Sequence, residues 1–285
     1  MSEQQIALIG PGVMAEAIIN GLIRQKVVAP EQIIVAGPRP ERGQELIARY
    51  GIQFTTDNAE AARRADIVIL SVKPQRLDAV LAGLRGQIRP EALVLSIVAG
   101  APIQKIARAL DHFIVVRAMP NTPAQIGQGI TVWTASSGVS GPQLEMARRI
   151  LGALGQEIFV EEENYLDMAT ALSGTGPAYV FLFMEALIDA GVHLGFPRRI
   201  AEQLVVQTLR GSVDYYTHRH DHPAHLRNEV TSPGGTSAAA LYYLEKAGFR
   251  TAISRAVWAA YERSQQLGRG KNSQPPENGE TREEK

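Results

Sequence analysis

Two glycines and several hydroxyl side chains lie together just before a predicted helix. Residues 229–237 read Glu-Val-Thr-Ser-Pro-Gly-Gly-Thr-Ser and lead into a run of helix-forming residues, Ala238–Leu241. Pro233 disfavours helix before it, the glycines allow close approach of the backbone, and Thr236 or Ser237 can cap the new helix. Because the first N–H groups of a helix are unpaired, this segment could bind a carboxylate or phosphate without a basic side chain. A simple loop with a helix cap is the alternative interpretation.

A second anion-binding pattern lies near the start of the chain, where a short apolar run meets a glycine-rich turn. Ile6–Ile9 precedes Gly10-Pro11-Gly12-Val13-Met14-Ala15, which opens an apolar-periodic helix. This is the dinucleotide-binding fingerprint with alanine at its third small position. Gly10 permits the tight turn, Gly12 lets the backbone meet a pyrophosphate, and Ala15 lets the helix pack closely on the strand. The pattern therefore predicts a nucleotide site.

The end of the next predicted strand bears on which dinucleotide is preferred. An NAD site would carry an acid there, which binds the ribose hydroxyls and repels a 2′-phosphate. Ile33–Ala36 instead runs into Gly37-Pro38-Arg39-Pro40-Glu41-Arg42, without an acid at the tip. Arg39, with Arg42 as a second candidate, could form paired hydrogen bonds with a 2′-phosphate. We therefore predict NADPH, with NADH possible; two solvated arginines are the alternative.

Three further segments are candidates to line the cofactor groove. Thr55–Asn58 caps a predicted helix, Ser71-Val72-Lys73-Pro74 ends a strand, and Ile97-Val98-Ala99-Gly100 ends another. Ligands of open α/β sheets bind outside the carboxyl ends of the strands, which is where these segments fall. The backbone of Lys73 is a safer candidate than its side chain, which could point to solvent.

The order of predicted elements indicates two domains. Short β-rich runs alternate with helical patterns up to about residue 160, which predicts a Rossmann-type α/β domain with a parallel sheet covered on both faces. The expected strands are Ile6–Ile9, Ile33–Ala36, Ile67–Ser71, Leu93–Val98, Ile114–Arg117, Ile130–Thr134 and Glu157–Val160. Beyond them, Tyr165–Gly195, Arg198–Thr217 and Ser237–Leu267 have helical spacing only. We expect a dinucleotide-binding domain over 1–160, an all-helical dimerisation and substrate domain over 161–268, and a disordered tail over 269–285.

The stretch Tyr165–Gly195 is apolar on most faces and contains Tyr-Val-Phe-Leu-Phe-Met at residues 179–184. A helix that is apolar all round needs cover on every side, and a small helical domain supplies little. We therefore predict that a second subunit covers it, so that the protein is a homo-oligomer.

Composition excludes several classes of partner. Lysine plus arginine and aspartate plus glutamate both number 29, which leaves no net charge to favour nucleic acid or an anionic membrane. There is no cysteine, so disulfides, thiolate chemistry and cysteine metal sites cannot occur. No stretch approaches the roughly 20 apolar residues of a membrane span. We expect a cytoplasmic protein that acts on a small molecule.

Five motifs together resemble those of a known family. In order they are Gly10–Ala15, Ser71–Pro74, Arg117-Ala118-Met119-Pro120-Asn121-Thr122-Pro123, Ser173-Gly174-Thr175-Gly176-Pro177-Ala178-Tyr179 and Thr231–Ser237. The chain resembles the pyrroline-5-carboxylate reductase family over about residues 5–267. This resemblance implies NAD(P)H-dependent reduction of a cyclic imine, 1-pyrroline-5-carboxylate, to L-proline in the last step of proline biosynthesis. It also implies interlocked dimers, which in many members assemble into larger rings.

The resemblance also assigns roles to individual residues. The substrate set is Ser232, Gly235, Thr236 and Ser237 for the carboxylate, with Glu229 at the start of that segment and Glu163 at the head of the helical domain. The residues expected to bind the cofactor are Gly10, Pro11, Gly12, Val13, Met14, Asn58, Ser71, Val72, Lys73, Pro74, Val98, Ala99 and Asn121. Arg39, the candidate for the 2′-phosphate, belongs with them. The family commonly has Thr at Ser237 and Asp at Asn228, so preorganisation at the first and an ionic role at the second are in doubt.

Hydride transfer to an imine requires a substrate oriented over the nicotinamide and positive charge on its nitrogen. A ring nitrogen that is already protonated needs only a positioned hydrogen-bond partner. Ser237 could be that partner or could relay a proton from water, and a purely orienting role is the alternative.

Two rival functions share parts of the pattern. A 3-hydroxyacid dehydrogenase of similar plan would use a catalytic lysine in its first long helix, but no lysine lies between Lys105 and Lys246. A non-enzymatic NADP-binding sensor would keep the glycine turn and lose the anion-binding segment, whereas this chain has both.

Four histidines, His218, His220, His222 and His225, form the one metal-like cluster in the sequence. Histidines two residues apart share a face only in an extended segment, but this stretch follows a helix and contains Pro223. We interpret it as a solvated connector and predict no metal site.

Overall fold

The structure is a computed structural model that describes residues 4–268. The predicted tail over 269–285 lies outside the described residues. The chain divides into two compact units: the first runs to Thr175 and resumes at Ala260, and the second is Gly176–Ala259. The second unit is therefore inserted between two parts of the first. The division falls after the short helix α7 (Tyr165–Ala169), which the sequence analysis had placed in the second domain.

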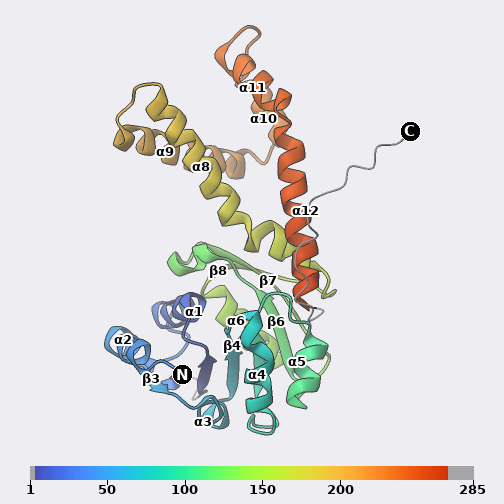
Figure 1. The fold of residues 1–285 in the computed structure, drawn as a ribbon. Coiled ribbons are helices and arrows are strands. Elements are labelled where there is room, and N and C mark those ends of the chain that lie inside the picture. The colour runs from blue at the N-terminus through green and yellow to red at the C-terminus, as the bar shows by residue number, and fades with distance from the viewer. Residues whose placement is uncertain (1–3, 269–285) are drawn as a thin grey trace, which may run out of the picture. The chain divides into compact units, whose positions relative to one another are not determined.

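An eight-stranded sheet forms the centre of the first unit, in the order β3-β2-β1-β4-β5-β6-β7-β8 (Figure 1). The strands are β1 (Ile6–Ile9), β2 (Ile33–Ala36), β3 (Gln53–Thr55), β4 (Ile67–Leu70), β5 (Leu93–Ser96), β6 (Val115–Met119), β7 (Gly129–Ala135) and β8 (Gly155–Phe159). The order reverses between β1 and β4, which is the switch point at which dinucleotides bind in this class of sheet. The predicted Rossmann-type architecture is thus confirmed.

Two helical layers bury the sheet on both faces. The helices of the first unit are α1 (Val13–Arg24), α2 (Pro40–Tyr50), α3 (Asn58–Arg64), α4 (Pro74–Leu84), α5 (Ile103–Leu110), α6 (Gly141–Gly152) and α7, together with the end of α12 (Phe249–Gly268). Ile6 and Leu8 pack with α1 and α6, whereas Ala7 and Ile9 pack with α3, α4 and α5. Successive residues of a strand point to opposite faces, so a strand covered on both sides is apolar throughout.

One pairing differs from the expected all-parallel sheet. β7 runs antiparallel to β6, while β8 is again parallel to β7. The connection between β6 and β7 contains only the 3₁₀ turn Thr122–Ile126, and a parallel crossover needs a dozen or more residues, usually including a helix. The sequence analysis also missed β3, because this three-residue strand is only half-buried and lacks an apolar run.

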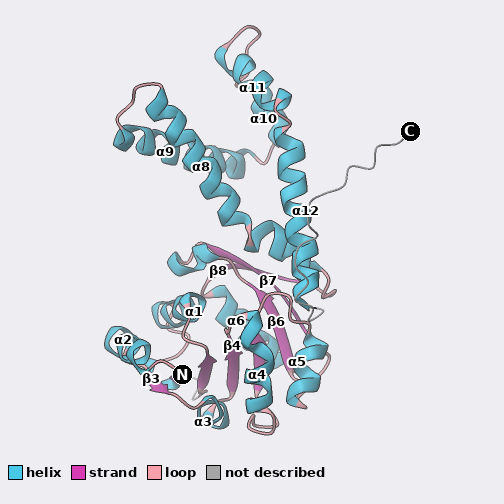
Figure 2. Ribbon diagram, viewed as in Figure 1, coloured by secondary structure: helices cyan, strands magenta, loops and turns pink. Residues whose placement is uncertain are grey.

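The second unit consists of helices and loops without strands (Figure 2). Its helices are α8 (Gly176–His193), α9 (Arg198–Arg219), α10 (Pro223–Glu229), α11 (Thr236–Lys246) and the first part of α12. The stretch Ser237–Leu267, which has helical spacing throughout, contains two helices, because Gly248 adopts a left-handed φ of 72° just after α11. α10 was not predicted; it begins at Pro223, a residue that favours the first position of a helix.

Almost none of the second unit is buried. Within Gly176–Ala259 only Ala201 is classed as buried, although Phe181, Leu182 and Leu204 are large apolar residues that are at least half exposed. Tyr165–His193 is long and apolar enough to cross a membrane by length and composition alone, which corrects the expectation that no stretch approaches a membrane span. One such helix is weak evidence for a membrane protein. The described helices therefore leave apolar surface that needs a cover from outside the unit.

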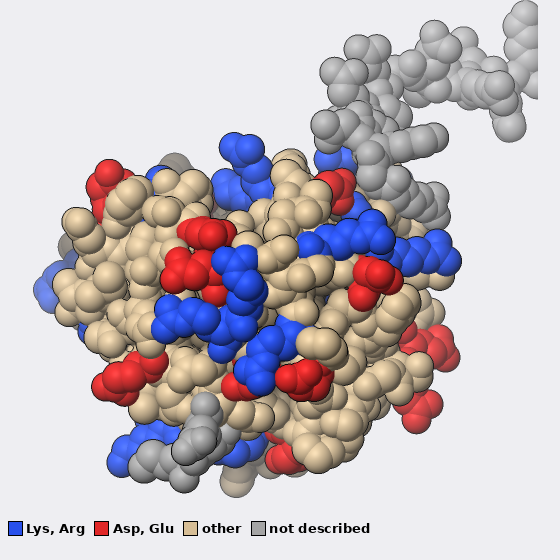
Figure 3. All heavy atoms as spheres, turned by 90° about the horizontal axis from the view of Figure 1, so that it is seen from below, with Lys and Arg blue, Asp and Glu red and all other residues tan. Residues whose placement is uncertain are grey.

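Charged side chains of both signs are interspersed on the face of the molecule drawn in Figure 3. This mixing agrees with the equal numbers of acidic and basic residues in the sequence. That face thus offers no broad field of one sign to attract a polyanion.

Candidate dinucleotide and substrate sites

A pocket of about 670 Å³ opens beyond the carboxyl ends of β1, β2 and β4 in the first unit. This volume lies within the range of small-molecule sites. Many of the predicted cofactor residues line it, namely Gly10, Pro11, Gly12, Arg39, Asn58, Ser71, Val72 and Lys73. Asp57, from the predicted segment Thr55–Asn58, lines it as well, and so do Gly37 and Arg76, which were not predicted. Gly37 directly follows the second strand, a position that the sequence pattern could have revealed.

The backbone of Gly10 requires glycine for two reasons. Its φ of 101° lies in the left-handed region, and a Cβ there would meet Val72 Cγ1 at 2.8 Å and the Ser71 carbonyl oxygen at 3.0 Å. The hydroxyl of Ser71 also donates to the carbonyl oxygens of Ile9 at 3.1 Å and Gly10 at 2.7 Å. The turn after β1 is therefore held in place by the end of β4, which explains why both segments carry signature residues.

Gly37 fixes the other side of the same turn. A Cβ on Gly37 would lie 2.3 Å from Cδ of Pro11, so the proline ring occupies the space that a side chain would need. The carbonyl oxygen of Pro11 accepts a hydrogen bond from Nε of Arg42 at 3.2 Å. These contacts hold the turn from the β2 side.

The N-terminus of α1 remains open to a ligand. Gly12 is the N-cap and provides no side-chain cap, so the N–H groups of Val13 and Met14 have no partner within the helix. A Cβ on Gly12 would come no closer than 4.0 Å to the Ser71 carbonyl oxygen. Packing within the protein therefore does not demand glycine at this position, whereas close approach of a phosphate to the backbone would.

The two candidate arginines have different surroundings. The guanidinium of Arg42 is fully engaged, because it bonds Pro11, Glu45 at 2.9 Å and, through a short contact, Glu16. Arg39 is exposed at the N-cap of α2 and forms no ion pair with any described residue. Arg39 is thus free to bind an anion, whereas Arg42 supports the turn.

Glu16 forms the centre of an ion cluster beneath this turn. It accepts hydrogen bonds from Arg42, from Arg49 at 2.5 Å and from the hydroxyl of Tyr50 at 3.0 Å. Burial raises the pKa of Glu16, but the hydrogen bonds from Arg42 and Tyr50 outweigh it, so its pKa lies below the usual 4.5. When Glu16 is charged, the cluster links the first turn of α1 to α2.

Two other motifs meet at the carboxyl end of β6. Asn121 accepts a hydrogen bond from the N–H of Ile130 at 3.0 Å and donates to the carbonyl oxygen of Ser173 at 3.2 Å. A Cβ on Gly174 would lie 2.6 Å from Cε of Met119. The structure therefore gives Asn121 a bridging position. It does not line the pocket beside the glycine turn, and neither do Val13, Met14, Pro74, Val98 or Ala99.

Glu163 takes part in a partly buried ion network of the first unit. Its Oε1 accepts from Nη1 of Arg117 at 2.9 Å and from the N–H of Ile103 at 2.7 Å. The side chain of Arg117 is only 4% exposed, so the two partners of this guanidinium, Glu163 and Asp167, balance a buried charge. The structure thus gives Glu163 a structural partner, and its predicted contact with substrate remains a prediction.

The substrate segment in the second unit forms a tight turn before α11. The N–H of Gly235 donates to the carbonyl oxygen of Ser232 at 3.0 Å, and Gly234 has a φ of 72°, as expected for Pro-Gly at the centre of a type II turn. Gly235, not Thr236 or Ser237, is the N-cap, which corrects the expected cap. The hydroxyls of Ser232, Thr236 and Ser237 make no hydrogen bond to another described residue, so the helix end and its hydroxyls are open.

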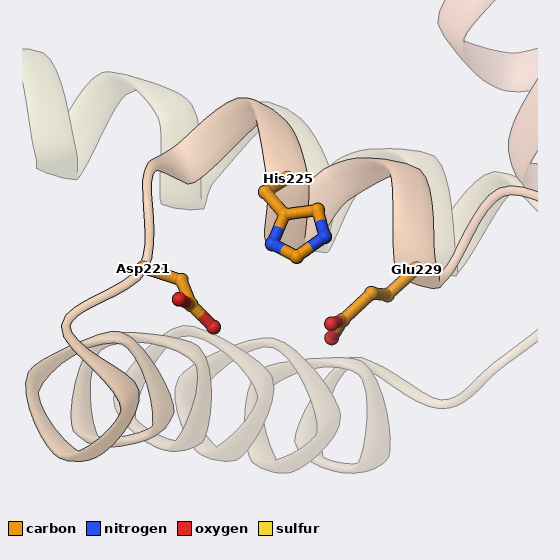
Figure 4. Close-up of side chains that lie close together, drawn as sticks. All are labelled: Asp221, His225 and Glu229. Carbon is orange, nitrogen blue, oxygen red and sulfur yellow. The ribbon is translucent and has the colours of Figure 1, made fainter.

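Glu229 belongs to a small polar cluster of the second unit, and its predicted contact with substrate remains a prediction. Asp221, His225 and Glu229 lie together, with ligand atoms within 4.8 Å of one another (Figure 4). Arg219 already pairs with Asp221 at 2.7 Å and with Glu229 at 3.0 Å, so a cation would have to compete with a guanidinium. His222 instead caps α10 by accepting from the N–H of Ala224 at 3.2 Å. These partners favour a structural connector.

Each half of the chain matches the model of a known protein family. Residues 163–267 match the family model described as pyrroline-5-carboxylate reductase dimerisation, and residues 5–100 match NADP oxidoreductase coenzyme F420-dependent. Pyrroline-5-carboxylate reductase of a Synechocystis species is 47% identical over 93% of this chain and 98% of its own length. The chain belongs to the pyrroline-5-carboxylate reductase family. The reductase of Pseudomonas aeruginosa is 41% identical over 94% of this chain and 98% of its own length.

Solved structures of the reductase family share the whole fold. The pyrroline carboxylate reductase of Plasmodium falciparum, solved with NADP bound, is 32% identical and has a TM-score of 0.87 over 94% of this chain and 99% of its own. The reductase of Coxiella burnetii is 35% identical, with a TM-score of 0.83 over 93% of this chain and 99% of its own. The described residues thus share the fold of these reductases over nearly the whole length of the solved chains.

Replacing Glu16 by Gln should destabilise the first unit in a pH-dependent manner. Because the pKa of Glu16 is lowered in the fold, its charge stabilises the protein above pH 4.5, and this stability is lost as the pH falls through the lowered pKa. We expect Glu16→Gln to lower the free energy of unfolding by about 1–3 kcal/mol at pH 7 and by progressively less below pH 4.5. Urea unfolding at several pH values measures this.

Glu41 on α2 is a suitable control, since it is exposed and has no ion partner among the described residues. Glu41→Gln should change the free energy of unfolding by less than about 0.5 kcal/mol, both at pH 7 and below pH 4.5. An equal loss for Glu16→Gln at both ends of the pH range would contradict the assigned role of its charge.

Proposed function

We propose that this chain reduces 1-pyrroline-5-carboxylate to L-proline with NADPH, the last step of proline biosynthesis. One hydride adds to the imine carbon and one proton to the ring nitrogen, which leaves NADP⁺ and the saturated amino acid. The observation that carries the proposal is the likeness to named reductases, which spans both units and 98% of the Synechocystis enzyme. The pocket geometry supports it independently.

The residues of the first unit fit a bound dinucleotide phosphate. The open N–H groups at the start of α1 would hold the pyrophosphate, and Gly12 leaves room for it. Arg39 would bind the 2′-phosphate, since it lines the pocket without an ion partner among the described residues. When bound, NADPH supplies the hydride.

The open turn before α11 fits the carboxylate of the cyclic imine. The N–H groups that follow Gly235 are unpaired within the helix, and the hydroxyls of Ser232, Thr236 and Ser237 can donate to the same anion. Ser237 also presents a hydroxyl that could hydrogen-bond the ring nitrogen and relay a proton from water.

A 3-hydroxyacid dehydrogenase is the second candidate with the same general plan. Alcohol oxidation needs a base, which the helical half of such enzymes supplies as a lysine. No lysine lies between Lys105 and Lys246 of this chain, so α8 and α9 contain none. Reduction of an imine whose nitrogen is already protonated needs only a positioned hydrogen-bond partner, which the available side chains can supply.

Purified protein should oxidise NADPH with 1-pyrroline-5-carboxylate at least tenfold faster than with a 3-oxoacid, the carbonyl compound that a 3-hydroxyacid dehydrogenase would reduce with NADPH. The six-membered homologue of the imine, assayed in parallel, measures the selectivity of the protein for the five-membered ring. Loss of absorbance at 340 nm reports turnover. A well-folded protein that binds NADPH but does not turn over the five-membered imine would overturn the proposal.

Ser237→Ala tests the hydroxyl within the same assay. It should lower kcat/KM for the imine about tenfold, while the Kd of NADPH stays within twofold. Ser137, an exposed serine of the first unit, provides the matched control Ser137→Ala. Nearly full turnover of Ser237→Ala would remove this hydroxyl from both proton transfer and orientation.

Arg39→Ala should raise the KM for NADPH about tenfold, because a hydrogen bond to a charged group contributes roughly 1.5–3 kcal/mol. The KM for NADH should change by less than twofold, since NADH lacks the 2′-phosphate. Arg85, which is exposed at the end of α4, gives the control Arg85→Ala. Equal use of both cofactors by the parent protein, unchanged in Arg39→Ala, would contradict this assignment.

We further propose that a second copy covers the apolar faces of α8 and α9, which makes the protein a homodimer in the cytoplasm. The match to a dimerisation family and the nearly complete exposure of residues 176–259 support this. A lipid bilayer is the other possible cover for the apolar stretch Tyr165–His193. This stretch contains Glu185 and Asp189, and a charged side chain is costly inside a bilayer.

Sedimentation should give at least twice the 30.9 kDa mass of one chain at micromolar concentration without detergent. Leu182 is 67% exposed on α8, so Leu182→Asp should shift the equilibrium towards monomer. Ser137→Ala should not. A parent protein that sediments as a stable monomer, or that requires detergent, would contradict the dimer.

A further inference from the structure

A buried serine lies on the last turns of α12, after the chain has returned to the first unit. Ser264 is 2% exposed, and its hydroxyl donates to Oδ1 of Asp167 at 2.9 Å. The two residues are 97 positions apart in sequence. A buried hydroxyl is costly unless it is hydrogen-bonded, so this pairing is a specific feature of the packing.

The same carboxylate oxygen also binds a buried arginine. Nη2 of Arg117, on β6, donates to Oδ1 of Asp167 at 2.9 Å, while Nη1 binds Glu163. Asp167 lies on α7, so one oxygen atom joins the central sheet to the helices on either side of the inserted unit. Because the charge of Arg117 is buried, loss of its partner would be strongly unfavourable.

A second contact holds the end of α12 against the loop that follows β5. Gly100 has a φ of 68°, and a Cβ there would lie 2.8 Å from both Cβ of Leu267 and the carbonyl oxygen of Ser264. A Cβ on Gly268 would lie 2.5 Å from the carbonyl oxygen of Gly100. The backbones are therefore in direct contact beside Val98 and Ala99, two residues of the predicted cofactor set.

The point at which the chain leaves the first unit is held at the same strand end. The π-helical turn Thr170–Gly174 precedes the division at Thr175, and its Ser173 carbonyl oxygen accepts from Asn121 at the end of β6. π-helical turns are rare and occur frequently at functional sites. Arg117 and Asn121 thus hold both connections of the helical unit.

We propose that Asp167 and Ser264 are positioning residues that fix how the helical unit leaves and rejoins the nucleotide-binding unit. The inference rests on the proposed function, since it assigns the contact a role in hydride transfer. Both connections are held by residues of the first unit. A displacement of about 1 Å can lower a rate by about a hundredfold, so we expect that loosening these connections lowers turnover.

Ser264→Ala removes the hydroxyl without adding bulk and leaves Arg117 paired with Asp167. We expect kcat for the imine to fall about tenfold, while the Kd of NADPH, measured by fluorescence without substrate, stays within twofold. Asp167→Asn keeps an oxygen for Ser264 but removes the charge opposite Arg117, so it should have the larger effect. Ser137→Ala, the same chemical change at an exposed site, should leave all values unchanged.

Two outcomes would overturn the proposal. One is parent-like kcat and KM in both Ser264→Ala and Asp167→Asn. The other is a loss of NADPH binding in parallel with kcat that follows the fraction of unfolded protein, which would indicate a purely structural role.

Amide hydrogen exchange separates this inference from the proposed function. In Ser264→Ala, exchange should accelerate at residues 165–175 and 260–268 and remain unchanged in β1 and β4, whether or not the parent chain turns over the imine. Unchanged exchange at both connections would show that the hydroxyl does not hold them, even if the reductase assignment stands.

Discussion

Both candidate sites depend on one constraint: a helix begins with N–H groups that the helix itself cannot pair. In α1 and in α11 the N-cap residue is a glycine, Gly12 and Gly235, so no side chain fills those donors. Much of the surrounding structure keeps these ends open and in place. Ser71, Val72 and Pro11 support the first turn, and the Ser232–Gly235 hydrogen bond closes the second. A reaction between two anions, a dinucleotide and an imino acid, can thus use backbone dipoles where basic side chains would otherwise be needed.

Sequence alone could reveal elements whose burial is uniform. β1, β2, β4 and β5 are short apolar runs because helices cover both faces, and the glycine turn follows from steric limits on backbone angles. Elements without such patterns were missed: β3 is half-buried, α10 is largely polar, and the break at Gly248 is a single backbone angle. The antiparallel direction of β7 depends on the short connection between β6 and β7. The periodicity of apolar residues does not indicate that direction.

Among the site residues, too, local motifs could be recognised from the sequence, whereas tertiary partners could not. The sequence pattern indicated Arg39 as the first candidate for the 2′-phosphate and Arg42 as the second, but only the fold shows that Glu16 binds Arg42. Glu163 and Glu229 were expected at the substrate, and the structure places them beside Arg117 and Arg219 respectively. Acidic side chains find partners that are distant in sequence, so their roles follow from tertiary contacts. Backbone donors at helix ends are fixed locally, which is why the motifs of both turns could be recognised directly.

The contact between α12 and Gly100 has a consequence for how the chain folds. The first unit includes residues from both sides of the insertion, so its packing beside β5 is incomplete until the chain has been synthesised to about residue 268. Domains generally fold as units, the N-terminal one first during synthesis. Here the nucleotide-binding half must wait for the far end of the chain. A nascent or truncated chain would therefore lack finished packing beside β5, which couples the completion of the first unit to the synthesis of the helical unit.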